Sequence, residues 1–347
     1  MKKAFFIIFL IASIPGLGLF SKIEPAHASG MDFSVRANIP DNQIDKNLSY
    51  FDLQMNPSSS QRISLTVENS SNKEIQVRIE PNAAITNQNG VIDYSKHNHE
   101  NDSSLKHAFS DIISPSQTVS LKGKESKKVF FDIQMPKQTF DGIILGGFYV
   151  YRSDGKEEEV RNNKNIQIKN AYSYVVGAKL RETAKIVFPE LKLNEVTAGL
   201  VNYHTVVTAN LQNVKPVIVK NLDVEARITK EGTNKTLHQT EKKNLSMAPN
   251  SNFDFPIDWD NQKLEPGKYH LYVTATNGHA TWNFDKVFEI KNTEAKKLND
   301  KAVELEKDHN LMLIFIGLAV IILALILFII VLLRKNKRGV TNEESFT

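Results

Sequence analysis

The chain has 347 residues, of which 41% are hydrophobic and none is cysteine, and its formal net charge is +4. Without cysteine, disulfide-stapled domains and cysteine-nucleophile enzymes are excluded, so each domain must rest on its hydrophobic core. Three lysines against one glutamate in residues 1–28, and four basic against two acidic residues in 334–347, give +2 at each end. Subtraction leaves the region between them neutral, and no nucleic-acid partner is expected for a surface without basic excess.

Residues 1–28 predict a secretory signal peptide. Lys2 and Lys3 precede an apolar run, and Ala26-His27-Ala28 forms the small-x-small pattern that signal peptidase recognises. An uncleaved anchor helix is the alternative, but Pro15 and the glycines after it interrupt the run. We therefore expect cleavage after Ala28 and export of the rest of the chain.

Residues 29–165 predict a first β-domain. Hydrophobic and polar residues alternate over 62–68 and again over 75–79, with a polar turn between them, and the pattern returns over 129–133. A period of two places one face of each segment in a core. The first two segments should form a hairpin-like pair.

Residues 166–292 predict a second β-domain. The strand-like segments of this region are 170–176, 206–211, 222–228, 269–274 and 282–288. Their spacing, with turns rich in Asn, Gly and Pro, is typical of immunoglobulin-type sandwiches. The fold class predicted is mainly β, with two tandem immunoglobulin-like antiparallel β-sandwich domains. The boundary follows the polar stretch 153–165, and the strand at 170–180 could belong to either domain.

The C-terminal region predicts helix. Residues 293–310 carry apolar residues at helical spacing and are expected to form a helical juxtamembrane stalk of roughly 27 Å. Residues 311–333 contain no charge and, as a helix of roughly 35 Å, would cross a hydrocarbon core of about 30 Å. The basic residues that follow predict stop-transfer and a cytoplasmic tail at 334–347; they are Arg334, Lys335, Lys337 and Arg338.

The glycines of the segment 140–152, FDGIILGGFYVYR, do not form a phosphate-binding loop. No Lys-Ser/Thr pair follows Gly147, and an aromatic, β-branched run begins at Phe148 instead. Gly142, Gly146 and Gly147 are therefore predicted to be structural, giving a sharp bend and close packing before the Phe148 strand.

Catalytic motifs are not supported. Ser-x-x-Lys occurs at Ser70, Ser103 and Ser153, but the companion motifs of penicillin-recognising enzymes are missing, as are G-x-S-x-G and H-E-x-x-H. His97 and His99, with His107, could ligate a metal from one strand face, but their polar surroundings favour a solvated loop. We expect no catalysis, no cofactor and no metal.

Aromatic residues are the candidates for ligand or partner contact. Tyr149 with Tyr151, and Tyr172 with Tyr174, are spaced to share a strand face, and exposed aromatics stack on sugars and anchor interfaces. The alternative is a face covered by a neighbouring strand or domain. Trp259 and Trp282 are equally compatible with a contact or a core position.

A series of segments resembles the WxL-interacting proteins, cell-surface proteins of Gram-positive bacteria. The segments are Met135-Pro136 with 140–147, then 170–177, 211–213 with Pro216, 247–253, 264–269, 282–284 and 297–303. The resemblance runs from about Asp32 into the apolar segment at 311–333. The order and spacing of the segments carry it, since no single motif is decisive.

The resemblance implies a peptidoglycan-binding first domain and a host-binding second domain, with WxL-domain surface proteins held alongside. The chain would then be a non-catalytic, membrane-anchored adaptor with peptidoglycan, WxL-domain proteins and host extracellular proteins as partners. Both domains would lie outside the cell. An assembly chaperone that uses a sandwich edge strand is the alternative, and a cell-wall hydrolase is contradicted by the missing motifs. Glycan specificity, the individual partner and stoichiometry stay open.

Overall fold

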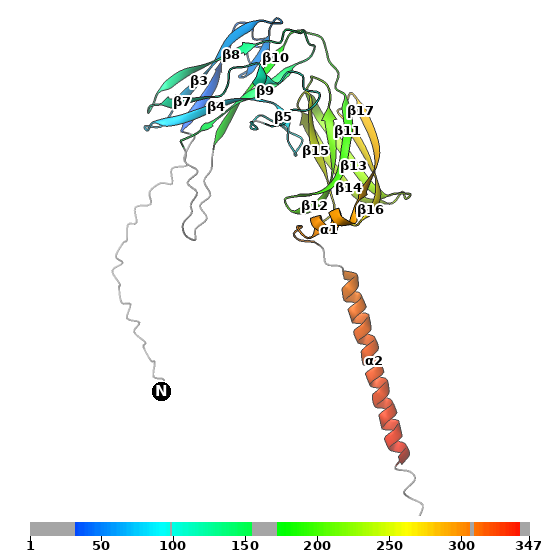
Figure 1. Ribbon diagram of the computed structural model, residues 1–347. Coiled ribbons are helices and arrows are strands. Elements are labelled where there is room, and N and C mark those ends of the chain that lie inside the picture. Colours follow the sequence, from blue (N-terminus) through cyan, green and yellow to red (C-terminus); the bar gives the residue numbers. More distant parts are fainter. Residues whose placement is uncertain (1–31, 98, 155–171, 306–308, 341–347) are drawn as a thin grey trace, which may run out of the picture.

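The computed structural model describes residues 32–97, 99–154, 172–305 and 309–340, so the predicted signal peptide lies outside the described residues. Two β-sandwiches follow one another along the chain, and a long helix extends from the far end of the second (Figure 1). The mainly β architecture predicted from the alternating patterns is confirmed.

The first sandwich contains a three-stranded and a five-stranded sheet. The smaller sheet has the order β1 (Phe33–Asn38), β3 (Ser60–Asn69), β8 (Ser126–Gln134). The larger has the order β2 (Phe51–Gln54), β10 (Ser173–Arg181), β9 (Ile144–Arg152), β4 (Ile75–Ala83), β7 (Gln117–Leu121). All pairs are antiparallel except β2 with β10. A 3₁₀ turn, η1 (Phe109–Asp111), and a small hairpin, β5 (Ile85–Thr86) with β6 (Ile92–Asp93), complete it.

The core of this sandwich is built around Phe148 of β9. Its ring lies 4.8 Å from that of Phe131, 5.8 Å from Phe109 and 6.0 Å from Phe51, so both sheets and η1 meet on it. Edge and tilted contacts of this kind add to the stabilisation from area burial. The alternating residues of β3 are buried beside this cluster, as the period of two predicts.

The strand β10 belongs to the first sandwich by its pairing. It lies between β9 and β2, with Val176 opposite Phe148 and Leu180 opposite Leu53. The strand at 170–180, which the sequence left open between the two domains, therefore lies in the first sandwich, and the connection between the sandwiches runs from residue 182 to residue 190. The pairing of β10 with β2 decides this assignment. It joins residues far apart in the sequence, so it could not be predicted from the residues of β10 alone.

The second sandwich contains a three-stranded and a four-stranded sheet. The first has the order β11 (Leu191–Val201), β12 (His204–Asn213), β15 (Ser251–Asp258). The second has the order β14 (Thr236–Met247), β13 (Val219–Lys230), β16 (Gly267–Thr276), β17 (Thr281–Ile290). Buried residues of both sheets form a second hydrophobic core.

The predicted stalk over 293–310 is corrected by the helix α1 (Asn292–Asn299), which ends early. Ala295 is buried in the second core, and Leu298 packs against it. The Asn299 side chain accepts from the Leu264 N–H at 2.9 Å and donates to the Leu264 carbonyl at 3.0 Å. These contacts make α1 a cap on the second sandwich.

The long helix α2 (His309–Val340) follows after a short break and points away from the sandwiches (Figure 1). Its side chains are described over 316–331, and all of them are exposed although most are large and apolar. Among the residues that the structure describes, no helix is found that is long and apolar enough to cross a membrane.

The junction between the sandwiches is tightly bonded. The Thr86 hydroxyl of β5 accepts from the Ala248 N–H at 3.0 Å and lies 2.6 Å from the Ser251 hydroxyl, both beyond β14. The Gly90 carbonyl, in the β5–β6 turn, accepts from the Ser246 N–H at 2.7 Å. The hairpin of the first domain is therefore seated on the second domain.

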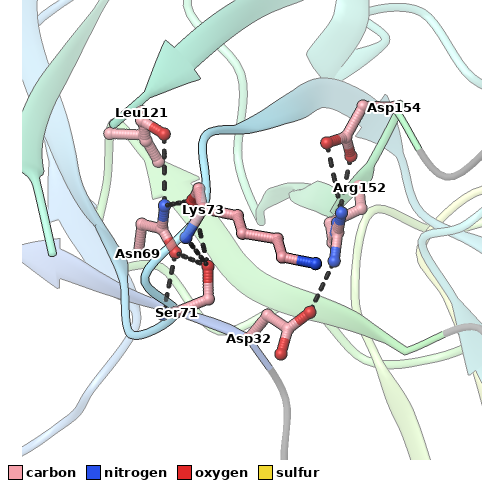
Figure 2. A network of polar contacts seen from close by, with 7 residues as sticks. All are labelled: Asp32, Asn69, Ser71, Lys73, Leu121, Arg152 and Asp154. Atoms are coloured by element: carbon pink, nitrogen blue, oxygen red, sulfur yellow. Dashed lines mark hydrogen bonds and ion pairs between the residues drawn. The ribbon is translucent and has the colours of Figure 1, made fainter. Parts of the chain in front are cut away.

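A buried asparagine closes the corresponding end of one strand in each sandwich. Asn69, at the end of β3, donates to the carbonyls of Lys73, at 2.7 Å, and Leu121 and accepts from Ser71 (Figure 2). It also donates to the Lys122 carbonyl. Asn213, at the end of β12, donates to the Val217 carbonyl and accepts from the Lys215 N–H at the same offsets of four and two residues. Both side chains are fully buried with their polar atoms bonded, so each fixes a turn.

Candidate functional site

The outer face of the five-stranded sheet gathers aromatic, charged and apolar side chains from three strands. Arg78 of β4 lies opposite Tyr151 of β9, and Glu80 lies opposite Tyr149. On the other side of β9, Val175 of β10 lies opposite Tyr149. We call these five residues the tyrosine face. Side chains two apart on a strand point to the same side, so the strand register alone brings the set together.

Glu80 organises the tyrosine face. Its Oε1 accepts from Arg78 Nε at 2.7 Å and from the Tyr151 hydroxyl at 3.1 Å, and its side chain is buried. Arg78 also donates to the hydroxyls of Ser116 and Thr118, at 2.9 and 3.3 Å. A buried carboxylate requires such partners, and they hold the Tyr151 ring in place.

The two rings of the face lie side by side. The Tyr149 and Tyr151 centroids are 5.3 Å apart with an interplanar angle of 40°. Both residues are half-buried, so ring surface is open to solvent. Burial, and then the bond to Glu80, raises the pKa of Tyr151 above its ordinary value.

Glycines provide the next row of the same face. Gly147 lies opposite Asn82 on one side and Gly177 on the other. A Cβ on Gly147 would lie 2.8 Å from the Tyr94 ring, so the absent side chain leaves room for that ring. Burial raises the pKa of Tyr94. This row continues the tyrosine face with a third phenol ring.

This arrangement is suited to binding a sugar. Flat aromatic rings accept the apolar face of a pyranose, and the neighbouring guanidinium, carboxylate and phenol groups bond to hydroxyls and amides. The tyrosine face therefore fits recognition of a glycan.

The sequence placed Tyr149 and Tyr151 among the contact candidates, and the structure adds Arg78 and Glu80 to them. The added residues alternate with buried residues in β4, so their common face is visible in the sequence. Their position beside the tyrosines depends on strand pairing over about 70 residues, as the separation of Glu80 and Tyr151 shows (71 residues).

The other aromatic candidates lie elsewhere. Tyr172 is exposed just before β10, whereas the Tyr174 ring is 5.2 Å from Phe33 and its hydroxyl donates to the Phe33 carbonyl. Trp259 is 3% exposed and stacks 4.0 Å from His238, so of the two alternatives that the sequence left open it takes the core position. Trp282 is half-buried against the second core.

The three structural glycines have different roles. Gly142 has φ +92°, and a Cβ there would lie 2.3 Å from the Pro216 carbonyl oxygen of the second domain. Gly146 and Gly147 are inside β9, where a Cβ on Gly146 would lie 2.2 Å from Phe109. The predicted sharp bend is thus at Gly142 alone, and the other two glycines allow close packing.

The histidine cluster does not assemble a metal site within the described part of the chain, where no group of three or more potential ligands is found. The His97 ring bonds to Asn82, and the His107 ring contacts Phe140 at 6.0 Å. Asp102, from the same polar run, bonds to Gln212 at 2.8 Å and to Asn252 in the second domain. The side chains of Arg334, Lys335, Lys337 and Arg338 lie outside the described ones.

A cavity of about 310 Å³ lies at the junction of the sandwiches. Lys106, His107 and Phe140 line it from the first domain, and Val214 and Pro216 from the second. The sequence did not predict it, because its walls come from segments that are distant along the chain.

Two family descriptions match the chain. Residues 33–152 match the peptidoglycan binding domain, and residues 163–300 the host binding domain, of the WxL Interacting Protein. The chain belongs to the WxL-interacting protein family. Both matched domains are described as binding domains, so this family member is a cell-surface binding protein. None of the curated proteins compared with the chain matches it.

Solved structures that resemble this WxL-interacting protein include fimbrial chaperones. "Crystal structure of the E. coli chaperone DraB" is 17% identical, covers 75% of this chain and 98% of its own, with a TM-score of 0.28. "Crystal Structure of Class 5 Fimbriae Chaperone CfaA" is 10% identical over 74% and 98%, with a TM-score of 0.27. Likenesses this distant carry no argument about function.

Proposed function

We propose that this WxL-interacting protein is a non-catalytic, membrane-anchored adaptor at the bacterial cell surface. Its first domain would bind peptidoglycan, and its ectodomain would hold a WxL-domain protein or a host ligand. The observation that carries the proposal is the tyrosine face, where Tyr149 and Tyr151 lie beside the Arg78–Glu80 pair in the domain matched as peptidoglycan-binding.

Recognition of a glycan strand by this face follows from its chemistry. A sheet face is long and open, so it fits an extended polymer better than an enclosed small molecule. The ring pair would stack on sugars, while Arg78 would donate to ring hydroxyls and N-acetyl carbonyls. No general acid, base or nucleophile is needed for such binding.

Anchoring by α2 is supported by its composition. Residues 311–333 carry no charge, and Arg334, Lys335, Lys337 and Arg338 follow at once. Apolar side chains that are exposed along the whole described part of α2 need an apolar environment. An uncharged helix of this length followed by basic residues is typical of a single-pass anchor with a cytoplasmic tail.

Co-sedimentation with purified peptidoglycan sacculi tests the binding. The ectodomain, residues 29–310, is expected to pellet with sacculi and to be displaced by soluble muropeptides in excess. An ectodomain that stays in the supernatant at every sacculus concentration would remove peptidoglycan from the proposal.

Truncation tests the anchor. A chain that ends after Asn310 should be released into the medium, whereas the full chain should stay with the membrane fraction. Leu323→Arg should weaken anchoring only in part, because a central charge costs about 2.5 to 3.5 kcal/mol on insertion scales. Equal retention of the truncated and full chains would make peptidoglycan binding the true anchor.

A further inference from the structure

The connection between the two sandwiches carries the two most exposed large apolar side chains among the described residues. Ile186 is 76% exposed and Phe188 is 77% exposed. Figure 1 shows this connection, between β10 and β11, as a loop that bridges the two sandwiches. Isolated exposed apolar residues are ordinary, but two such residues on one short segment indicate an interaction site.

The exposure pattern of this segment is that of a strand. From Ile186 to Glu190 the residues alternate between exposed and half-buried, so Ile186 and Phe188 share the solvent side and Val187 faces the protein. Alternation with a period of two is typical of an extended backbone. We call residues 184–189 the linker strand, although it pairs with none of the strands that the structure describes.

Both ends of the linker strand are tied down. At the start, the Thr183 hydroxyl and Lys185 Nζ donate to the two carboxylate oxygens of Asp141, at 2.9 and 2.7 Å. At the other end, the Glu190 carbonyl accepts from the Val214 N–H at 3.1 Å, and Lys215 pairs with its carboxylate at 2.8 Å. A segment held at both ends loses little conformational entropy when a partner binds.

Between these ties the main chain has no partner in the described structure. Within the residues described, the main-chain N–H and C=O groups of Ile186, Val187 and Phe188 form no hydrogen bond. An extended segment with open main-chain groups and apolar side chains at alternate positions is a template for strand addition.

We propose that the linker strand is the docking site for an extended segment of a partner protein, which adds to it as a β-strand. The partner segment would carry apolar side chains at alternate positions that pack on Ile186 and Phe188. This inference rests on the proposed adaptor function, because it assigns the surface on which a WxL-domain protein would be held.

A lipid surface does not fit as the occupant. Val303, just ahead of α2, donates its N–H to the Tyr203 carbonyl in the β11–β12 turn, so α2 leaves from that end of the second sandwich. The linker strand joins the opposite end of β11, and the 11 residues of this strand separate the two ends by roughly 36 Å. A partner in the aqueous or wall layer is the fitting occupant.

Cysteine labelling tests the proposal directly, because the chain contains no cysteine. Ile186→Cys and Phe188→Cys are made singly, with Tyr203→Cys as the matched control, since Tyr203 is 66% exposed at the opposite end of β11. Maleimide labelling is measured with and without a purified WxL-domain protein. We expect labelling at 186 and 188 to slow at least about tenfold in the complex, with labelling at 203 unchanged.

Two further measurements separate the outcomes. Amide exchange at Val187 and Phe188 should slow in the complex. The double variant Ile186→Asp with Phe188→Asp should weaken binding at least about tenfold while its melting temperature stays unchanged.

Full affinity of that double variant, or unchanged amide exchange, would overturn strand addition while the adaptor function stands. Protection without the partner in a dimer would assign the site to a second copy instead. If the wild-type chain binds no WxL-domain protein, the adaptor function itself fails, and the inference falls with it.

Discussion

The hydroxyls of Thr86 and Ser251 lie 2.6 Å apart across the junction between the two sandwiches, and both residues are buried. Ser251 donates to the Ala248 carbonyl at 2.8 Å, so its only proton is used there. Thr86 therefore donates to Ser251 and accepts from the Ala248 N–H. This closed set of bonds joins the two domains into one unit.

Thr86→Val tests that unit. Valine keeps the shape but leaves the buried Ala248 N–H without a partner, which should lower the free energy of unfolding by about 1 to 3 kcal/mol. Thr197→Val is the control, because it removes an exposed hydroxyl contact of 3.1 Å with Thr208 and should change stability by less than about 0.5 kcal/mol. Urea unfolding measures both. Equal losses would mean that the junction contributes no more than the surface.

Gly90→Ala tests the contact of the β5–β6 hairpin with the second domain. Gly90 has φ +69°, and an added Cβ would lie 2.9 Å from Leu245 of the second domain. Gly278 has φ +81° with no neighbour within 4 Å, so Gly278→Ala reports the backbone strain alone, about 1 to 2 kcal/mol. Gly90→Ala should destabilise by roughly 1 kcal/mol more, because Leu245 must move. The same loss in both variants would show that Leu245 moves aside without a measurable cost in stability.

Gly146→Ala tests close packing in β9. Its Cβ would meet the Phe109 ring at 2.2 Å inside the first core, which should destabilise by about 1 to 3 kcal/mol or more. Gly199→Ala, in β11 with open space around it, should instead stabilise by about 0.5 kcal/mol, because glycine weakens a strand. Thermal unfolding compares them. A neutral effect of Gly146→Ala would mean that Phe109 is free to move aside.

The junction should also weaken in acid through Asp102. Burial disfavours its charge, but hydrogen bonds from Asn252, Ser104 and Gln212 outweigh this and hold its pKa below the usual value. A lowered folded-state pKa stabilises the fold above the unfolded pKa of about 4, and this contribution is lost as pH falls through the folded value. The stability difference between wild type and Asp102→Asn should therefore shrink below about pH 4. A constant difference from pH 7 to pH 3 would contradict the role of this charge.

Alternation of hydrophobic and polar residues predicted strands such as β3, β4 and β8, because each sheet has one buried face. The hairpin expected between the first two of these segments is wrong, because β3 and β4 lie in different sheets. Alternation placed Ile63, Leu65 and Val67 correctly in the core. It did not assign β10, since the parallel pairing of Leu180 with Leu53 is non-local. Helical spacing predicted helix near 293–310 but missed its early end, because the docking of Asn299 on Leu264 is a tertiary contact.

The candidate site was predicted only in part, again because spacing along one strand is visible in the sequence and pairing between distant strands is not. Tyr149 and Tyr151 share a face by spacing alone, and the structure brings Glu80 to them through the pairing of β4 with β9. The sequence left Trp259 open between a contact and a core position, and the stacking of His238 on it, a contact between separate segments of the chain, decides for the core. Asp102 lies in a run that was expected to be solvated, but two of its partners belong to the second domain, with Gln212 110 and Asn252 150 residues away.

The most direct test of the account is the affinity of the full chain for purified sacculi when the tyrosine face is removed. We compare wild type, Tyr149→Ala with Tyr151→Ala, and the control Tyr203→Ala, which removes an exposed tyrosine of the second domain. The account predicts that the double variant binds sacculi at least about fivefold more weakly, because it loses an aromatic contact worth more than about 1 kcal/mol. The control should bind like wild type. Unchanged binding by a folded double variant would contradict the tyrosine face as the peptidoglycan site.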